Sequence, residues 1–250
     1  MCRHLAYLGE PVALGDLIVR PPHALLRQAW APRTQTSGVV NADGFGVGWY
    51  ADGDPVPARY RRTGPIWGDL SFADLARVVR SGAFLGAVRG ATLPGADGEA
   101  AAAPLASGPW LFSHNGAVPG WPGTLTPLAS TLPAAELLEL EARTDAALLW
   151  ALVLHRLRAG RSPGDALAET VTAAAEAAPE ARLNLLLTDG EQIAATAWGN
   201  SLWYLSGPDR VVVASEPYDD DPLWQEVPEH TLVTARPSDV TLIPLKEFTA

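Results

Sequence analysis

The chain has 250 residues, a formal net charge of −10 and a sequence pI near 4.9. This acidic balance argues against nucleic acid and anionic membrane surfaces as partners, because both are bound by clustered lysine and arginine. Hydrophobic residues make up 48% of the chain and charged residues 18%, which excludes a disordered protein.

The first half of the chain predicts short strands between glycine- and proline-rich breaks. The expected strands are His4–Leu8, Phe45–Ala51, Phe84–Arg89 and Leu111–His114. Apolar residues at helical spacing predict a helix over Asp69–Arg80. The Ala-, Gly- and Pro-rich segment Ala91–Pro109 is expected to be a long surface loop, either functional or a tolerated insertion.

The middle of the chain predicts helices, and strands follow it. The expected helices are Ala134–Ala142, Thr144–Ala159 and Ser162–Ala178. The second is apolar nearly all round, so it should be buried, and Thr144 can cap it. The later strands are expected at Arg182–Thr188, Gln192–Trp198, Leu202–Ser206, Val211–Ala214, Thr231–Thr234 and Thr241–Leu245. This order suits two packed antiparallel sheets covered by helices, in one domain over residues 1–250.

Cys2 is the first candidate for chemistry, and it is the only cysteine of the chain. Removal of Met1 would leave a thiol and a free α-amine on one residue. Their ordinary pKa values, about 8.5 and 7.7–8.0, let the amine take the thiol proton at little cost. Taken alone, Cys2 is more simply a small buried side chain. With no signal-peptide pattern and no disulfide, we expect a cytoplasmic protein.

Three further positions each have a functional and a structural interpretation. Asn115 and Gly116 could supply an amide group and a backbone N–H to an oxyanion hole, or could form an ordinary hairpin turn. Arg89 could hold a carboxylate, or could be a surface residue at a strand end. Asp145 could hold an ammonium group, or could be a first-turn acid favoured by the helix dipole. His114 is given no role.

The glycine-rich segment 41–50 (NADGFGVGWY) lacks the dinucleotide-binding G-x-G-x-x-G pattern. We interpret it as close backbone packing under a site. The five histidines are scattered without metal-ligand spacing, so no metal and no cofactor are expected.

The order of these motifs resembles the class II glutamine amidotransferase family. The motifs are Cys2 and the runs NADGFGVGWY, VRGAT, WLFSHNG and RTDAALL. More narrowly, the start MCRHLAYLG, the run NADGFGVGWY and the late run VVVASEPYDDDPLW resemble the amidohydrolases of ergothioneine biosynthesis, which remove the γ-glutamyl group from γ-glutamyl-hercynylcysteine sulfoxide. The resemblance covers Met1 to about Leu245.

The resemblance implies an α+β fold, the four-layer αββα sandwich of the N-terminal-nucleophile hydrolases. It also implies that the mature chain from Cys2 onward is one glutamine amidotransferase type-2 domain. Cys2 would be the nucleophile, Asn115 and Gly116 the oxyanion hole, Arg89 the carboxylate ligand and Asp145 the ammonium ligand. The substrate would be a small γ-glutamyl compound.

Two alternatives remain open at this point. One is a glutaminase subunit that feeds ammonia to a separate synthase, although Arg3 stands where ammonia-producing members usually have glycine. The other is a catalytically silent binding protein of the same fold. The trimethylammonium group of the proposed substrate suits aromatic faces, and Trp121 and Trp224 are candidates, although core packing is the stronger explanation for both. The oligomeric state is left undetermined.

Overall fold

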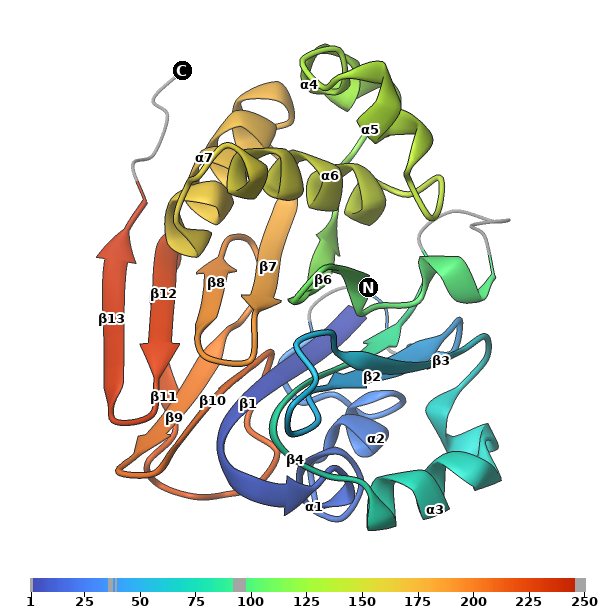
Figure 1. The fold of residues 1–250 in the computed structure, drawn as a ribbon, viewed down its shortest axis with the longest axis vertical. Coiled ribbons are helices and arrows are strands. Elements are labelled where there is room, and N and C mark those ends of the chain that lie inside the picture. Colours follow the sequence, from blue (N-terminus) through green and yellow to red (C-terminus); the bar gives the residue numbers. More distant parts are fainter. Residues whose placement is uncertain (1, 36–37, 39, 92–97, 246–250) are drawn as a thin grey trace.

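The computed structural model describes residues 2–35, 38, 40–91 and 98–245, and Figure 1 shows their arrangement. The strands of the first half are β1 (Cys2–Ala13), β2 (Phe45–Trp49), β3 (Ala58–Arg62), β4 (Arg80–Arg89), β5 (Leu105–Ser107) and β6 (Trp110–Ala117). The helices are α1 (Gly15–Ile18), α2 (Leu25–Gln28), α3 (Leu70–Val78), α4 (Thr126–Ala129), α5 (Ala134–Leu138), α6 (Asp145–Arg158) and α7 (Pro163–Ala177). Short 3-10 helices are η1 (Ile66–Gly68), η2 (Glu99–Ala101) and η3 (Gly123–Leu125). The later strands are β7 (Arg182–Thr188), β8 (Ile193–Ala197), β9 (Trp203–Gly207), β10 (Arg210–Ala214), β11 (Gln225–Glu226), β12 (Thr231–Arg236) and β13 (Asp239–Pro244).

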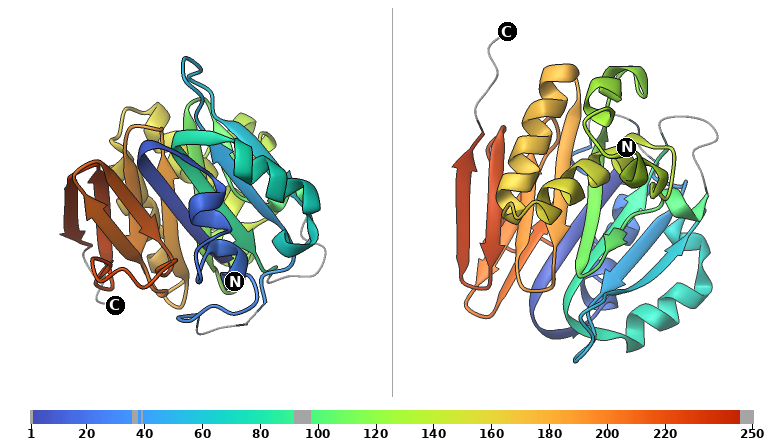
Figure 2. Two further views of the ribbon diagram at one scale, coloured as in Figure 1. Left: turned by 90° about the horizontal axis from the view of Figure 1, so that it is seen from below. Right: turned by 45° about the horizontal axis from the view of Figure 1, so that its top comes forward.

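These strands form two antiparallel sheets. One has seven strands in the order β11-β9-β10-β1-β4-β2-β3, and the other has six in the order β13-β12-β8-β7-β6-β5. Helices α6 and α7 pack on the six-stranded sheet, whereas α1, α2 and α3 pack on the seven-stranded sheet. Figure 2 shows the helices and sheets from two further directions. The expected four-layer αββα sandwich is therefore confirmed.

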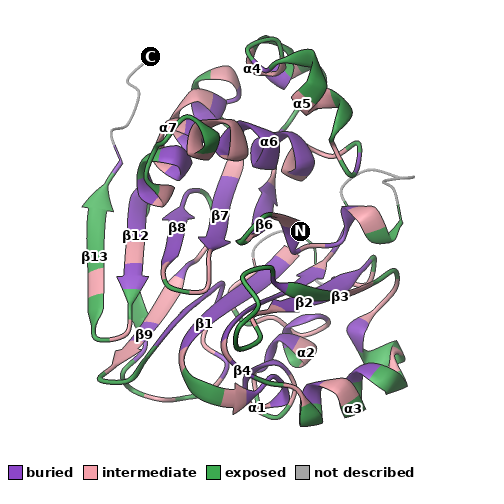
Figure 3. Ribbon diagram, in the orientation of Figure 1, coloured by how far each residue is buried: buried purple, intermediate pink, exposed green. Residues whose placement is uncertain are grey.

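Three apolar layers separate the four layers of backbone, as the alternation of side chains along β1 illustrates. Leu5 and Tyr7 point into the layer beneath α1, α2 and α3, while Ala6 and Leu8 point into the layer between the sheets. Figure 3 shows buried residues running through the strands of both sheets, with exposed residues on β3, β13 and α5. Each fully buried leucine contributes about 1.5–3 kcal/mol.

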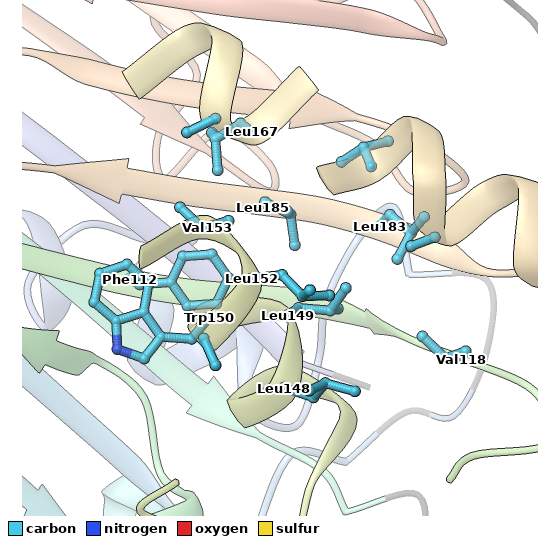
Figure 4. Packing of buried hydrophobic residues seen from close by; sticks show 14 of the residues in the cluster. Phe112, Val118, Leu148, Leu149, Trp150, Leu152, Val153, Leu167, Leu183 and Leu185 are labelled. Carbon is cyan, nitrogen blue, oxygen red and sulfur yellow. The ribbon is translucent and has the colours of Figure 1, made fainter. Parts of the chain in front are cut away.

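Helix α6 packs on β5 and β6 through its buried first half. The hydroxyl of Thr144 accepts a hydrogen bond from the N–H of Ala147, which confirms the predicted cap. Residues 147–153 are buried, and Trp150 stacks on Phe112 with ring centroids 5.1 Å apart (Figure 4). The helix was expected to be buried throughout, but its last turns are partly or fully exposed and carry Arg156 and Arg158.

Some differences from the predicted elements lie at sheet edges, and the helix expected over Ala134–Ala142 ends at Leu138. The segment 91–109, expected to be a loop, contains η2 and β5, and its residues 92–97 lie outside the described part of the chain. The charged edge strand β3 was not predicted. Asn115 and Gly116 lie within β6 rather than in a hairpin turn. None of the helices in the described residues is long and apolar enough to cross a membrane.

Candidate active site

A cavity of about 480 Å³ opens where β1, β4 and β6 meet the N-terminus of α6. Four of the five residues expected in the site line it: Cys2, Arg89, Gly116 and Asp145. They come from the first residue of β1, the last of β4, the end of β6 and the first turn of α6. Positions 143 residues apart in sequence are therefore brought to one cavity by the two sheets and one helix.

Cys2 begins the central strand of the seven-stranded sheet and pairs directly with Arg89 on β4. Burial raises the pKa of the Cys2 thiol, and the nearby Asp145 carboxylate acts in the same direction. The Arg89 guanidinium and a hydrogen bond from the backbone N–H of Gly90 oppose that rise in pKa. Because burial dominates, the thiol is protonated at neutral pH and needs a base in order to act as a nucleophile. The predicted removal of Met1 falls on a residue outside the described part of the chain.

Arg89 is held by the start of the glycine-rich segment. Its N–H donates to the Gly44 carbonyl (2.8 Å), and its own carbonyl accepts the Asp43 N–H (2.9 Å). The Asp43 carboxylate also accepts the N–H of Ala91 (2.7 Å). These hydrogen bonds fix the backbone of Arg89 and Ala91 against Asp43 and Gly44. Arg89 lines the cavity.

The glycines that follow allow β2 to pack tightly against the second sheet. A Cβ atom at Gly46 would lie 2.5 Å from the Ala103 carbonyl oxygen, and one at Gly48 would lie 2.7 Å from Leu111. Ala103 lines the cavity. The interpretation of this segment as close backbone packing under the site is thus confirmed.

Asp145 lies at the first position of α6 and joins this helix to the end of β6. Its carboxylate accepts the backbone N–H groups of Val118 (3.0 Å) and Ala146 (2.8 Å). A carboxylate in the first turn is favoured by the helix dipole, so the structural interpretation holds. The same carboxylate also lines the cavity, which keeps it available for an ammonium group.

Asn115 is fully buried and does not line the cavity, although its neighbours Ser113 and Gly116 do. Its Nδ2 donates to Ser215 Oγ (3.2 Å), which also accepts the backbone N–H of His4 (3.0 Å). The backbone carbonyl oxygen of Asn115 accepts a hydrogen bond from Asn200 Nδ2 (3.0 Å). Within the described part of the chain, Asn115 Oδ1 has no hydrogen-bond partner. The hydrogen bond to Ser215 fixes the Asn115 side chain, which the structure does not bring to the cavity wall with the other four residues.

Gly116 is required by the neighbouring strand. A Cβ atom there would lie 1.8 Å from the Arg182 carbonyl oxygen of β7 and 2.4 Å from His114 Nε2. That imidazole nitrogen is itself 2.9 Å from the same carbonyl oxygen. The absence of a side chain lets β7 approach and leaves the backbone of Gly116 open to the cavity.

His4 and Ser113 form a buried contact between the two sheets, with His4 Nδ1 3.1 Å from Ser113 Oγ. Burial lowers the pKa of His4 to about 3, helped by His114 and Arg3, so the imidazole is neutral. Sequence reasoning assigned Ser113 no role. Its position two residues before Asn115, on the same face of β6, is the signal that could have indicated one.

Arg3 lies on the opposite face of β1 from Cys2 and His4 and does not line the cavity. It is buried 3.9 Å from the equally buried Glu216 carboxylate, which accepts the backbone N–H groups of Arg33 and Thr34. Arg3 was interpreted as a departure that disfavours glutamine. Its position means that it does not select between substrates by direct contact.

The outer wall of the cavity includes Trp121 and Arg143, whereas Trp224 lies elsewhere. The Trp224 indole N–H donates to Asp219 (2.8 Å), and its ring packs in the layer beneath the seven-stranded sheet. No group of three or more His, Cys, Asp or Glu side chains in the described residues could hold a metal ion.

Comparison with known proteins adds to this geometry. The family model of class-II glutamine amidotransferases matches residues 24–209. The chain is 43% identical to the gamma-glutamyl-hercynylcysteine sulfoxide hydrolase of Mycolicibacterium smegmatis, over 98% of this chain and 100% of that one. The protein of the same name from Mycobacterium tuberculosis is 42% identical, over 98% and 97% of the two chains. A solved glutamine aminotransferase class-II domain protein from Silicibacter pomeroyi has a TM-score of 0.68 and 24% identity, over 98% and 100% of the two chains, which shows the shared fold.

Proposed function

The chain belongs to the family of class-II glutamine amidotransferases, and on that premise we propose that it hydrolyses the γ-glutamyl amide of γ-glutamyl-hercynylcysteine sulfoxide. The products are glutamate and hercynylcysteine sulfoxide, a step of ergothioneine biosynthesis. The observation that carries the proposal is the meeting of Cys2, Arg89, Gly116 and Asp145 at one cavity. The two relatives that match nearly the whole chain support the choice of substrate.

The charges around Cys2 fit an α-amino acid end on the substrate. Arg89 and Asp145 carry opposite charges and line the same cavity as Cys2, and Arg89 is the strand partner of Cys2. The guanidinium of Arg89 binds the α-carboxylate of the glutamyl group, and the carboxylate of Asp145 binds its α-ammonium. This arrangement leaves the γ-carbonyl beside the sulfur.

The chemistry then follows from the protonated thiol. Once Met1 is removed, the α-amine of Cys2 takes the thiol proton as the sulfur attacks the γ-carbonyl carbon. The oxyanion that forms is stabilised by the Gly116 N–H and the remaining amide hydrogen of Asn115. The amine returns its proton to the leaving nitrogen as the C–N bond breaks. Water then attacks the thioester, and the thiol leaves with a proton as glutamate is released.

Three broader properties go with this function. We propose that the chain from Cys2 onward is one glutamine amidotransferase type-2 domain, since all thirteen strands in the described residues belong to the two sheets. The single cysteine is suited to the reducing cytoplasm, where we place the protein. The substrate is a small molecule, and the net charge of −10 disfavours nucleic acid as a partner.

The test is glutamate release from γ-glutamyl-hercynylcysteine sulfoxide by the wild type, by Cys2→Ala and by Cys2→Ser. We expect release by the wild type and a loss of at least about 10⁴-fold in Cys2→Ala. Intact-mass measurement of each protein reports whether Met1 has been removed. Unchanged turnover by Cys2→Ala would refute the proposal. Faster hydrolysis of free glutamine than of the sulfoxide would favour the ammonia-supplying alternative instead.

A further inference from the structure

The cavity is larger than the glutamyl group requires. Its volume of about 480 Å³ lies within the range of roughly 300–1,000 Å³ that encloses drug-sized ligands. Cys2, Arg89 and Asp145 account for the glutamyl end. The remaining wall must therefore contact the part of the substrate that leaves.

That remaining wall combines one indole, one cation and apolar side chains. The indole belongs to Trp121 and the cation to Arg143, while Leu105 and Val118 supply apolar surface. Trp121 follows the end of β6, where its backbone N–H donates to the Val118 carbonyl (3.3 Å), and it packs partly buried against the core around α6. The indole is therefore anchored by packing on one side and borders the cavity on the other.

Arg143 precedes the helix cap and lies two residues before Asp145. Its side chain is exposed, so its charge reaches the cavity from the solvent side. The wall thus includes an indole and a guanidinium.

The hercynyl group has chemistry that matches this pair, because it is the betaine of histidine. It carries a trimethylammonium group next to a carboxylate. A quaternary ammonium is poorly hydrated and binds well to the face of an indole, and a carboxylate binds to a guanidinium.

We propose that Trp121 and Arg143 form a betaine subsite, in which the indole takes the trimethylammonium group and the guanidinium takes the adjacent carboxylate. The subsite rests on the proposed function for its ligand. Repulsion between Arg143 and the trimethylammonium group is offset because the betaine is neutral overall. Leu105 and Val118 contact the apolar parts of the imidazole arm.

Binding of the reaction product tests this subsite without requiring turnover. Calorimetry measures the affinity for hercynylcysteine sulfoxide and for S-methylcysteine sulfoxide, which lacks the betaine. We expect the wild type to prefer the first compound. Trp121→Leu should reduce that preference between about 3- and 30-fold, and Trp121→Phe should reduce it less, because benzene binds cations more weakly than indole. Arg143→Gln should also reduce it.

Trp67→Leu is the matched control, because Trp67 is 41% exposed and lies outside the cavity. The ratio of the affinities for the two sulfoxides should be the same in Trp67→Leu as in the wild type. Equal preference in the wild type, Trp121→Phe and Arg143→Gln would overturn the subsite, even if Trp121→Leu failed to fold. Failure of the wild type to release glutamate from the sulfoxide would instead refute the proposed function, and the two failures are therefore distinguishable.

Discussion

Replacing Gly116 with alanine tests the claim that β7 dictates the residue at this position. The added Cβ atom would lie 1.8 Å from the Arg182 carbonyl oxygen, whereas contacts below 3.0 Å are essentially never seen for real Cβ atoms. The two strands would have to separate by more than about 1 Å, because the obstacle is backbone and not a flexible side chain.

The cost of that separation follows from the position of the pair within the sheet. β6 and β7 pair over seven residues near the middle of the six-stranded sheet, between β5 and β8. Overpacking of a rigid interior costs about 1–3 kcal/mol, and each ladder hydrogen bond lost adds about 1 kcal/mol. We expect Gly116→Ala to lose at least about 3 kcal/mol of the free energy of unfolding, which corresponds to a fall in Tm of about 6–12 °C.

Urea denaturation and a thermal melt measure this loss, with Gly123→Ala as the control. An added Cβ atom at Gly123 meets nothing within 4 Å, so that variant should keep the stability of the wild type or exceed it slightly. If Gly116→Ala folds with a free energy of unfolding within about 1 kcal/mol of the wild type, the close approach of β7 does not explain the glycine.

Four further variants test the site and its surroundings. Asn115→Ala should lower kcat about 10²- to 10³-fold with little change in KM, and a change confined to KM would contradict an oxyanion role. Arg89→Lys should raise KM because it loses the two-pronged guanidinium contact. Asp145→Asn should raise KM, and because the two carboxylate oxygens accept one backbone N–H each, from Val118 and Ala146, the single amide oxygen of asparagine can keep only one of these hydrogen bonds. Steady-state kinetics report the loss of recognition, and a thermal melt reports the accompanying loss of about 1 kcal/mol of stability. His4 has a folded-state pKa of about 3 against 6.5 ordinarily, so the unfolded chain binds more protons between these values. The neutral His4 therefore contributes free energy of unfolding above about pH 6.5, and this contribution should be lost as the pH falls towards 3. In urea titrations, the drop in free energy of unfolding between pH 7 and pH 4.5 should be smaller for His4→Asn than for the wild type.

Much of the fold could be predicted because local patterns agree with the tertiary contacts. Strand β7 was predicted with the observed bounds, and so was the cap of α6 at Thr144, which follows from ordinary N-cap chemistry. The edge strands β3 and β5 were missed. Their sequences, ARYRR and LAS, lack a clear apolar alternation, and pairing with a neighbouring strand is what makes them strands.

The site could be predicted to the extent that its residues carry recognisable motifs. The Asn115–Gly116 pair favours a turn by local preference, but pairing with Asn184 and Leu183 on β7 holds it in an extended strand. Gly90 and Ser113 were not found, because their contacts depend on which strands meet. Ser113 contacts His4 from the other sheet, 109 positions away in the chain, and no local pattern encodes that distance.

Arg3 and Glu216 form a buried ion pair, so a substitution at one of these distant positions is expected to require a substitution at the other. Loss of Arg3 alone would leave a carboxylate in the protein interior without its cation, a state that typically costs 3–5 kcal/mol. Relatives with glycine directly after the nucleophile should therefore carry an uncharged residue at the position of Glu216, or supply a cation from another segment. The pleat of β1 lets such paired replacements accumulate on one face of the strand while the nucleophile on the other face stays in place.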